Sequence, residues 1–400
     1  MAATSASACC RSPAQHPQNV AVDAAYPARR RPPWSTRFRE RLIFPIDTVS
    51  RVVPRYRIPR KTMSILADRP RLEARSLPRP LHTVPRRAVA ITLIAGVLAP
   101  GLANACSTCG CSLNSDWSSQ GYAITTGLHL SVREDYFDQS QLVSGTDTIS
   151  RSSISFPADQ EVQQKTINRV TLLGADYNFS RYWGLSVQLP YTDRHHQTIA
   201  AGDTDISTSN ARGIGDLRVL ARYQGISDDA GIGLQFGLKL PTGRFTQNFE
   251  SGPQAGARLD RGLQLGTGTT DALLGVYKSG YLSQSIGYFG QAMAQIALDA
   301  RAHFRPGNSL NVNFGLRYLD AGRFVPQLQL NLHSEQRESG SQADRPNSGA
   351  TLAYLSPGIG IKITPRLDAF AFVQLPIWQR VNGLQLEPRR LWSVGAQYRF

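Results

Sequence analysis

Three cysteines lie within one six-residue stretch, at Cys106, Cys109 and Cys111, and they are the most reactive group of side chains in the sequence. The other two cysteines, Cys9 and Cys10, lie near the start of the chain. Thiolates at C-x-x-C spacing can close on one soft metal ion, such as Cu(I) or Zn(II), or form a reactive redox pair. The spacing makes these three residues candidate metal ligands, with copper or zinc as the cofactor.

Two other fates of these thiols remain open. One is a disulfide formed in an oxidising compartment, which leaves a spare thiol. The other is lipidation of Cys106, although Ala103-Asn104-Ala105 ahead of it fits a lipobox poorly. A complete zinc site needs four ligands, and no nearby histidine or fourth cysteine supplies the last one. A mononuclear site would therefore be incomplete or shared.

The segment before the cysteines has the parts of a secretory signal peptide. Arg86 and Arg87 precede a 12-residue apolar run, Ala88 to Ala99, and the small-x-small unit 103–105 follows it. We expect residues 86–105 to be removed after Ala105. Residues 106–120 then form a Cys-rich periplasmic N-terminal segment.

Residues 1–85 are rich in proline and arginine and show no sustained periodicity, which predicts a disordered basic leader. A normal signal peptide has only a few residues ahead of its apolar run, so this long leader needs an explanation. A mis-assigned start, with Met63 as the true first residue, is favoured over a disordered cytoplasmic extension. Residues 1–105 hold 18 of the 44 Lys and Arg residues but 5 of the 29 Asp and Glu residues, which leaves 26 against 24 for the rest. The basic excess belongs to the leader, so nucleic acid is not an expected partner.

The body of the chain alternates apolar and polar residues with a period of two. The stretches Gly231–Leu240, Leu310–Tyr318 and Gln327–His333 show this most clearly. No apolar run in the body approaches ~20 residues, which excludes a helical membrane protein. In a lipid-embedded barrel the apolar face meets acyl chains and the polar face lines the lumen, whereas a soluble barrel inverts this polarity.

The turn signals divide the body into twelve expected strands. Short turns follow the even strands, and longer polar loops mostly follow the odd ones, which is the outer-membrane pattern with the short turns on the periplasmic side. The predicted fold class is all-β, an antiparallel transmembrane β-barrel over residues 121–400. The expected strands are 121–136, 163–178, 183–196, 213–224, 230–245, 262–278, 285–303, 309–319, 324–336, 351–363, 367–380 and 390–400.

The last nine residues alternate strictly and close on a terminal phenylalanine, as in the C-terminal signature that barrel assembly machinery reads. The predicted assembly signal is Trp392, Val394, Tyr398 and Phe400. Aromatic residues also gather near the short turns, as an interfacial girdle would. Three odd strands end in a Leu-Pro unit, at 189–190, 240–241 and 375–376, for which strand termination is favoured over a ring of bulges.

Alternation also assigns the residues that line the lumen. Basic side chains outnumber acidic ones among them, so mild anion preference is a hypothesis. Alternatively, the charged groups satisfy one another across a narrow, plugged lumen. The predicted lumen-lining residues are His129, Arg133, Asp216, Arg218, Arg222, Lys239, Asn313, Arg317, Gln329, His333 and Lys362.

Enzymatic chemistry is not expected, and no catalytic residue is assigned. His333 and Ser334 are adjacent, but neighbouring strand residues point to opposite faces and cannot converge on a substrate. The same divergence argues against a metal ion shared by His195 and His196, which we expect to be solvated.

The cysteine cluster, Gly213-Ile214-Gly215-Asp216, the Leu-Pro-Thr-Gly unit at 240–243 and Ser356-Pro357-Gly358 together resemble a known family. The body is similar to the outer-membrane barrel transporters akin to the "MetA-pathway of phenol degradation" group. This resemblance implies uptake of hydrophobic or aromatic compounds, which the polar residues assigned to the lumen do not obviously support.

The sequence therefore predicts a channel or transporter for small solutes in the Gram-negative outer membrane. The alternative is a barrel that anchors a periplasmic soft-metal or redox segment, CSTCGC. Expected partners are outer-membrane lipid, the barrel assembly machinery and a small-molecule solute.

Overall fold

The computed structural model describes residues 126–400, which form one antiparallel sheet. Two short 3-10 turns, η1 (Arg151–Ser153) and η2 (Arg261–Leu263), interrupt the loops, and no helix in this part of the chain is long and apolar enough to cross a membrane. The strands are β1 (Gly127–Gly145), β2 (Asp147–Thr148), β3 (Val162–Asn178), β4 (Trp183–Ile199), β5 (Ile206–Ile214), β6 (Leu217–Tyr223), β7 (Ile232–Leu240), β8 (Asp271–Tyr281), β9 (Ile286–Ala297), β10 (Ser309–Tyr318), β11 (Phe324–Glu335), β12 (Ala350–Lys362) and β13 (Leu367–Arg399).

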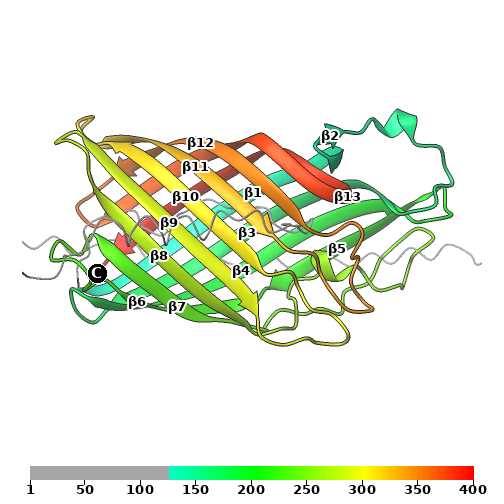
Figure 1. Cartoon of the computed structure of the whole chain (residues 1–400), viewed down its shortest axis with the longest axis horizontal. Coiled ribbons are helices and arrows are strands. Elements are labelled where there is room, and N and C mark those ends of the chain that lie inside the picture. The colour runs from blue at the N-terminus through cyan, green and yellow to red at the C-terminus, as the bar shows by residue number, and fades with distance from the viewer. Residues whose placement is uncertain (1–125) are drawn as a thin grey trace, which may run out of the picture. The chain divides into compact units, whose positions relative to one another are not determined.

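The sheet closes into a barrel (Figure 1). Successive strands pair in chain order from β3 through β13, with β5 displaced, and β13 pairs back with β1 from His129↔Arg399 to Gly145↔Val381. Eleven strands form the ring, while β2 pairs only with β1 and β5 only with β4. The predicted all-β barrel is confirmed. Closure leaves the ring without an open edge. An open edge would expose unpaired backbone N–H and C=O groups, and no water is present in the lipid core to bond them.

The 33 residues of β13 are two arms that meet at a tight turn. Gly383 has φ +57°, and Asn382-Gly383 is the dipeptide that two-residue hairpin turns prefer. The first arm pairs with β12 and the second with β1. At the far end, the backbone N–H of Arg399 donates to the carbonyl of Arg366 at 2.8 Å. The wall therefore has twelve spans, as expected, but the loop expected at 381–389 is wrong because the chain turns directly from one arm to the other.

The burial pattern of β11 shows which face of the wall meets which medium. Leu328 and Leu330 are 44% and 37% exposed, while Gln329 and Asn331, which alternate with them, are fully buried. Apolar side chains thus point out of the barrel and polar ones point in. A band of apolar side chains this extensive would be costly in water, so the exterior is built for lipid and the soluble-barrel alternative is excluded.

Aromatic side chains form two exposed bands on the exterior. Trp183 and Tyr191 of β4 lie in different bands, eight residues apart, which is ~27 Å along a strand and ~20 Å across a membrane at the usual tilt. That spacing is close to the apolar height of outer-membrane barrels. The band at the short turns contains all nine residues expected there, Tyr177, Phe179, Tyr182, Trp183, Tyr281, Tyr318, Phe324, Tyr398 and Phe400, and the other contains Tyr136, Tyr191, Trp378 and Trp392.

Several strand boundaries differ from the expected ones. β1 continues to Gly145, beyond the expected end at 136, because β13 pairs with it on one side as far as Gly145, while β3 pairs with it on the other side as far as Gln139 and β2 at Val143 and Ser144. β5 occupies part of the expected loop 197–212 by extending alongside β4. β8 begins at Asp271 rather than at 262. Residues 241–270 are consequently one long connection between β7 and β8.

Candidate functional site: the barrel lumen

The predicted lumen residues occupy inward-facing positions of the wall or its ends. Arg133 is half-buried, and Arg218 and Lys362 are exposed to the spaces that they line. The other eight are buried, namely His129, Asp216, Arg222, Lys239, Asn313, Arg317, Gln329 and His333.

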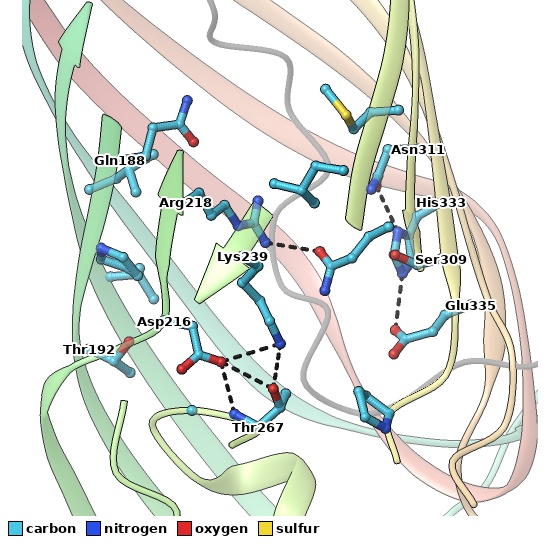
Figure 2. A pocket seen from close by; sticks show the side chains of 18 of the residues that line it. Gln188, Thr192, Asp216, Arg218, Lys239, Thr267, Ser309, Asn311, His333 and Glu335 are labelled. Atoms are coloured by element: carbon cyan, nitrogen blue, oxygen red, sulfur yellow. Dashed lines mark hydrogen bonds and ion pairs between the residues drawn. The ribbon is translucent and has the colours of Figure 1, made fainter. Parts of the chain in front are cut away.

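A cavity of about 450 Å³ lies within the barrel (Figure 2). Six predicted lumen residues line it: Arg133, Asp216, Arg218, Lys239, Asn313 and His333. Apolar side chains also line it, which the sequence analysis missed: Val170, Leu172, Leu220, Leu273 and Met293. The register of β3 could have revealed two of them, because Leu172 and Val170 lie four and six residues before Asp176, which pairs with the inward His129 of β1. The lumen wall is therefore mixed rather than purely polar.

The connection 241–270 contributes to the cavity wall through residues 261–267. An apolar cluster of Phe249, Leu259, Leu263 and Leu265 packs with Ala211 of β5 and holds it in place. Arg194 of β4 donates to the carbonyls of Gly262 and Gln264 at 3.5 and 3.3 Å. Because these contacts join the connection to inward-facing wall residues, it narrows the lumen rather than extending away from the barrel.

Asp216 fixes both ends of this connection. Its Oδ1 accepts the backbone N–H of Gly243 at 3.0 Å, and its Oδ2 accepts the backbone N–H of Thr267 at 3.0 Å. Lys239 places its Nζ 3.3 Å from Asp216 and 2.8 Å from Asp271, and also bonds Thr267. A buried ammonium shared by two carboxylates makes this a charged and fully hydrogen-bonded anchor inside the wall.

Two of the motifs behind the family resemblance meet at this anchor. Thr242 Oγ1 donates to the carbonyl of Gly215 at 2.7 Å and accepts the N–H of Leu217 at 2.9 Å. The N–H of Gly215 donates to the carbonyl of Pro190 at 2.8 Å. A Cβ at Gly215 would lie 3.0 Å from Pro190 Cγ and 3.1 Å from the Leu265 carbonyl, so the close approach favours glycine.

The Leu-Pro units serve different roles. Pro241 follows the last residue of β7, but Pro190 and Pro376 lie inside β4 and β13. At Pro190, β4 changes partner from β6 to β5, and beside Pro376 the pairing with β12 shifts register. Strand termination, the favoured interpretation, is therefore wrong for two of the three. A proline without an N–H is tolerated where the ladder changes partner or register.

A second polar cluster lies across the cavity from Asp216 and Lys239 (Figure 2). His333 Nδ1 lies 2.7 Å from Asn311 Oδ1, and His333 Nε2 lies 3.4 Å from Glu335 Oε2. Arg218 projects toward the space between the clusters and donates to Gln295 at 3.4 Å. Charged groups of both signs thus line opposite sides of one cavity.

The adjacent polar pairs considered in the sequence diverge as expected. Ser334 Oγ lies 3.4 Å from Thr351 Oγ1, on the strand face opposite His333. His195 bonds Asn210 at 2.7 Å, while His196 bonds Thr166 at 2.8 Å and is fully buried rather than solvated. Within residues 126–400, no group of three or more His, Cys, Asp or Glu side chains is placed to hold a metal ion.

The cysteine cluster Cys106, Cys109 and Cys111, the signal peptide 86–105 and the leader 1–85 lie outside the described residues. The predictions about thiol chemistry, cleavage and the true start therefore stay predictions.

A closed antiparallel ring with an apolar exterior, aromatic bands and a polar interior defines the class of fold: that of outer-membrane β-barrels. No protein-family model matches the chain, and no curated protein matches it. Its structure is similar to the COG4313 outer membrane channel from Pseudomonas putida F1, with a TM-score of 0.51 and 14% identity over 70% of this chain and 97% of that one. At this identity the similarity concerns the fold alone.

Two more distant similarities are to porin and transporter barrels. The NanC porin aligns with a TM-score of 0.37 and 13% identity, covering 68% of this chain and 100% of that one. The Ralstonia pickettii toluene transporter TbuX aligns with a TM-score of 0.36 and 9% identity, covering 69% and 90%.

Proposed function

We propose that the protein is a channel that passes small solutes across the outer membrane and carries out no enzymatic reaction. The observation that carries this proposal is a cavity of about 450 Å³ inside a closed barrel whose exterior suits lipid. Outer-membrane lipid and the barrel assembly machinery are the partners that such a wall requires.

The connection 241–270 sets the width of the proposed channel. It is held by Asp216, Arg194 and an apolar cluster, so it acts as a constriction that resists displacement. Solutes that pass must fit beside it. The proposed substrates are therefore small molecules rather than oligomers.

The mixed wall supports solutes with both apolar and polar parts. Leu220, Leu273 and Met293 offer an apolar surface, while Arg218 and His333 offer hydrogen bonds in the same cavity. Such a combination orients a ligand by a few polar contacts on a mainly apolar body. The family resemblance implies uptake of aromatic compounds, which the polar lumen residues alone did not support. The apolar part of the cavity wall provides a structural basis for it.

Planar-bilayer conductance of the purified full chain tests the proposal. A Cys106→Ser/Cys109→Ser/Cys111→Ser variant is the matched control for the alternative cysteine function. Discrete open steps in both proteins are expected. A barrel that folds but stays closed in both, at every voltage and with every small solute tried, would contradict the channel function.

A further inference from the structure

A second cavity, of about 580 Å³, lies at the short-turn end of the barrel, and the charged residues that line it are four basic ones and one acidic one. We call it the basic vestibule and define it by Arg317, Arg323, Lys362, Asp368 and Arg399. It lies apart from the central cavity, with which it shares no lining residue. Four positive groups thus face one carboxylate.

The single carboxylate is already engaged. Asp368 Oδ2 accepts Arg399 at 2.8 Å, and Arg399 also donates to the carbonyl of Pro365 at 3.0 Å. The nearby Asp320 accepts the hydroxyl of Ser285 at 2.7 Å and is not part of the vestibule lining. One carboxylate can neutralise a single positive charge, so the four cationic groups leave the vestibule with an excess of positive charge.

Arg323 and Lys362 supply that excess in an accessible form. Phe324 of β11 pairs with Ile361 of β12, and the N–H of Lys362 donates to the Arg323 carbonyl at 2.9 Å, which places the two cationic residues side by side. Both side chains are exposed, and Lys362 lies opposite Asp368 in the register of β12 and the first arm of β13. Two adjacent exposed cations repel each other, and a bound anion with at least two charges relieves this.

We infer that the basic vestibule binds small oxyanions that carry two or more negative charges. The vestibule lies at one end of the lumen, so a role for it in selecting transported solutes rests on the proposed channel function. Binding itself depends only on the folded barrel.

Calorimetric titration of the full chain, folded in detergent, with citrate tests the inference. Arg323→Gln/Lys362→Gln removes both accessible cations and is expected to weaken citrate binding about tenfold, with Lys362→Gln showing a smaller loss in the same direction. Lys278→Gln is the matched control, since Lys278 is exposed on the outward face of β8 beside Val276. It should leave citrate binding unchanged. Raising the salt concentration should weaken binding to the wild type more than to the double variant.

Absence of citrate binding to the wild type, or equal affinity in the wild type and the double variant, would overturn the inference. Reversal potentials in a KCl gradient separate it from the channel proposal. Citrate binding without any conductance would retain the vestibule site and remove the channel, whereas conductance without citrate binding would do the reverse.

Discussion

The Asp216 carboxylate accepts the backbone N–H of Gly243 at 3.0 Å, and this bond joins the Gly-Ile-Gly-Asp segment to the Leu-Pro-Thr-Gly segment. The same carboxylate holds Thr267 at the other end of the connection 241–270. One side chain thereby fixes both ends of a 30-residue segment that narrows the lumen. The anchor therefore holds in place, together with Arg194 and the apolar cluster, the segment that constricts the lumen.

Asp216→Asn should release this constriction. The amide keeps the shape of the carboxylate but loses one acceptor and the charge that Lys239 contacts, which should cost ~1–3 kcal/mol locally. We expect larger or more frequent open steps in single-channel recordings, and faster tryptic cleavage after the exposed Arg244 and Arg258.

Asp193→Asn provides the control for that experiment. Asp193 pairs with Arg212 at 2.8 Å, but Arg212 is 66% exposed, and such surface pairs contribute ~0–1 kcal/mol. Its conductance and cleavage should match the wild type. If Asp216→Asn also matches the wild type in both, the anchor does not hold the connection.

Glu161 predicts a pH dependence at the loop end of the barrel. Burial, and then the negative charge of Asp260 on the connection 241–270, raise the pKa of Glu161 to about 8. Burial also raises the pKa of Asp260, and Asp344 adds repulsion to both carboxyl groups. Between these two pKa values, Glu161 therefore keeps its proton in the folded state, whereas the unfolded chain has released it. The contribution of Glu161 to the stability of the folded state is therefore most favourable below its ordinary pKa of about 4.5, and it falls as the pH rises toward about 8.

We expect the connection to loosen over that interval, measured as an increase in large open steps between about pH 5 and about pH 9. Glu161→Gln should remove most of this dependence, because the neutral amide mimics the protonated acid. A variant that keeps the full pH dependence would show that other groups cause it.

The C-terminal residue should affect assembly more than stability. Phe400 is 65% exposed and its ring packs on Tyr398 at 4.9 Å, so little buried area depends on it. Phe400→Ala should refold normally in detergent and yet give much less assembled barrel in cells, measured by heat-modifiable gel mobility. Tyr318→Ala removes another exposed aromatic residue of the same band. Equal loss in both variants would mean that the band, and not the terminal signal, was disturbed.

The three cysteines are expected to behave independently of the barrel. Thiol titration of the mature protein with and without Cu(I) should show either protected thiols, if the segment binds the metal, or an unchanged count, if a disulfide has formed. Conductance of the triple serine variant should equal that of the wild type. A changed conductance would link the segment to the lumen.

The strands of the wall could be predicted from the sequence because each of them shows the alternation of apolar and polar residues within its own length. Leu328 and Leu330 alternate with Gln327 and Gln329, and this local pattern fixes which face meets lipid. The inward position of Lys239 follows by the same rule. The anchor could not be predicted, because the partner of Asp216 is a backbone N–H 27 positions further along the chain, and no side-chain pattern marks it.

Two further features carried a signal that the alternation obscured. Asn382-Gly383 favours a two-residue hairpin, but the polar residues after it suggested a loop, although Leu386 and Glu387 beyond the turn are buried. Leu172 faces the lumen even though lumen positions were expected to be polar. In the connection 241–270, residues 241–245 and 262–270 were expected to belong to strands and the rest to a loop, and only the tertiary contacts reveal that the segment enters the barrel.

The seam between β1 and β13 has a consequence for biogenesis. His129 pairs with Arg399, so the first described strand bonds to the second arm of β13, which follows all the other strands of the ring in the chain. Until that arm is in place, β1 has an unsatisfied edge that could pair with any other exposed strand. Such a ring is sealed in a late step with a high entropic barrier. A chain truncated before its final arm should accumulate as an open sheet that depends on chaperones, rather than as a smaller pore.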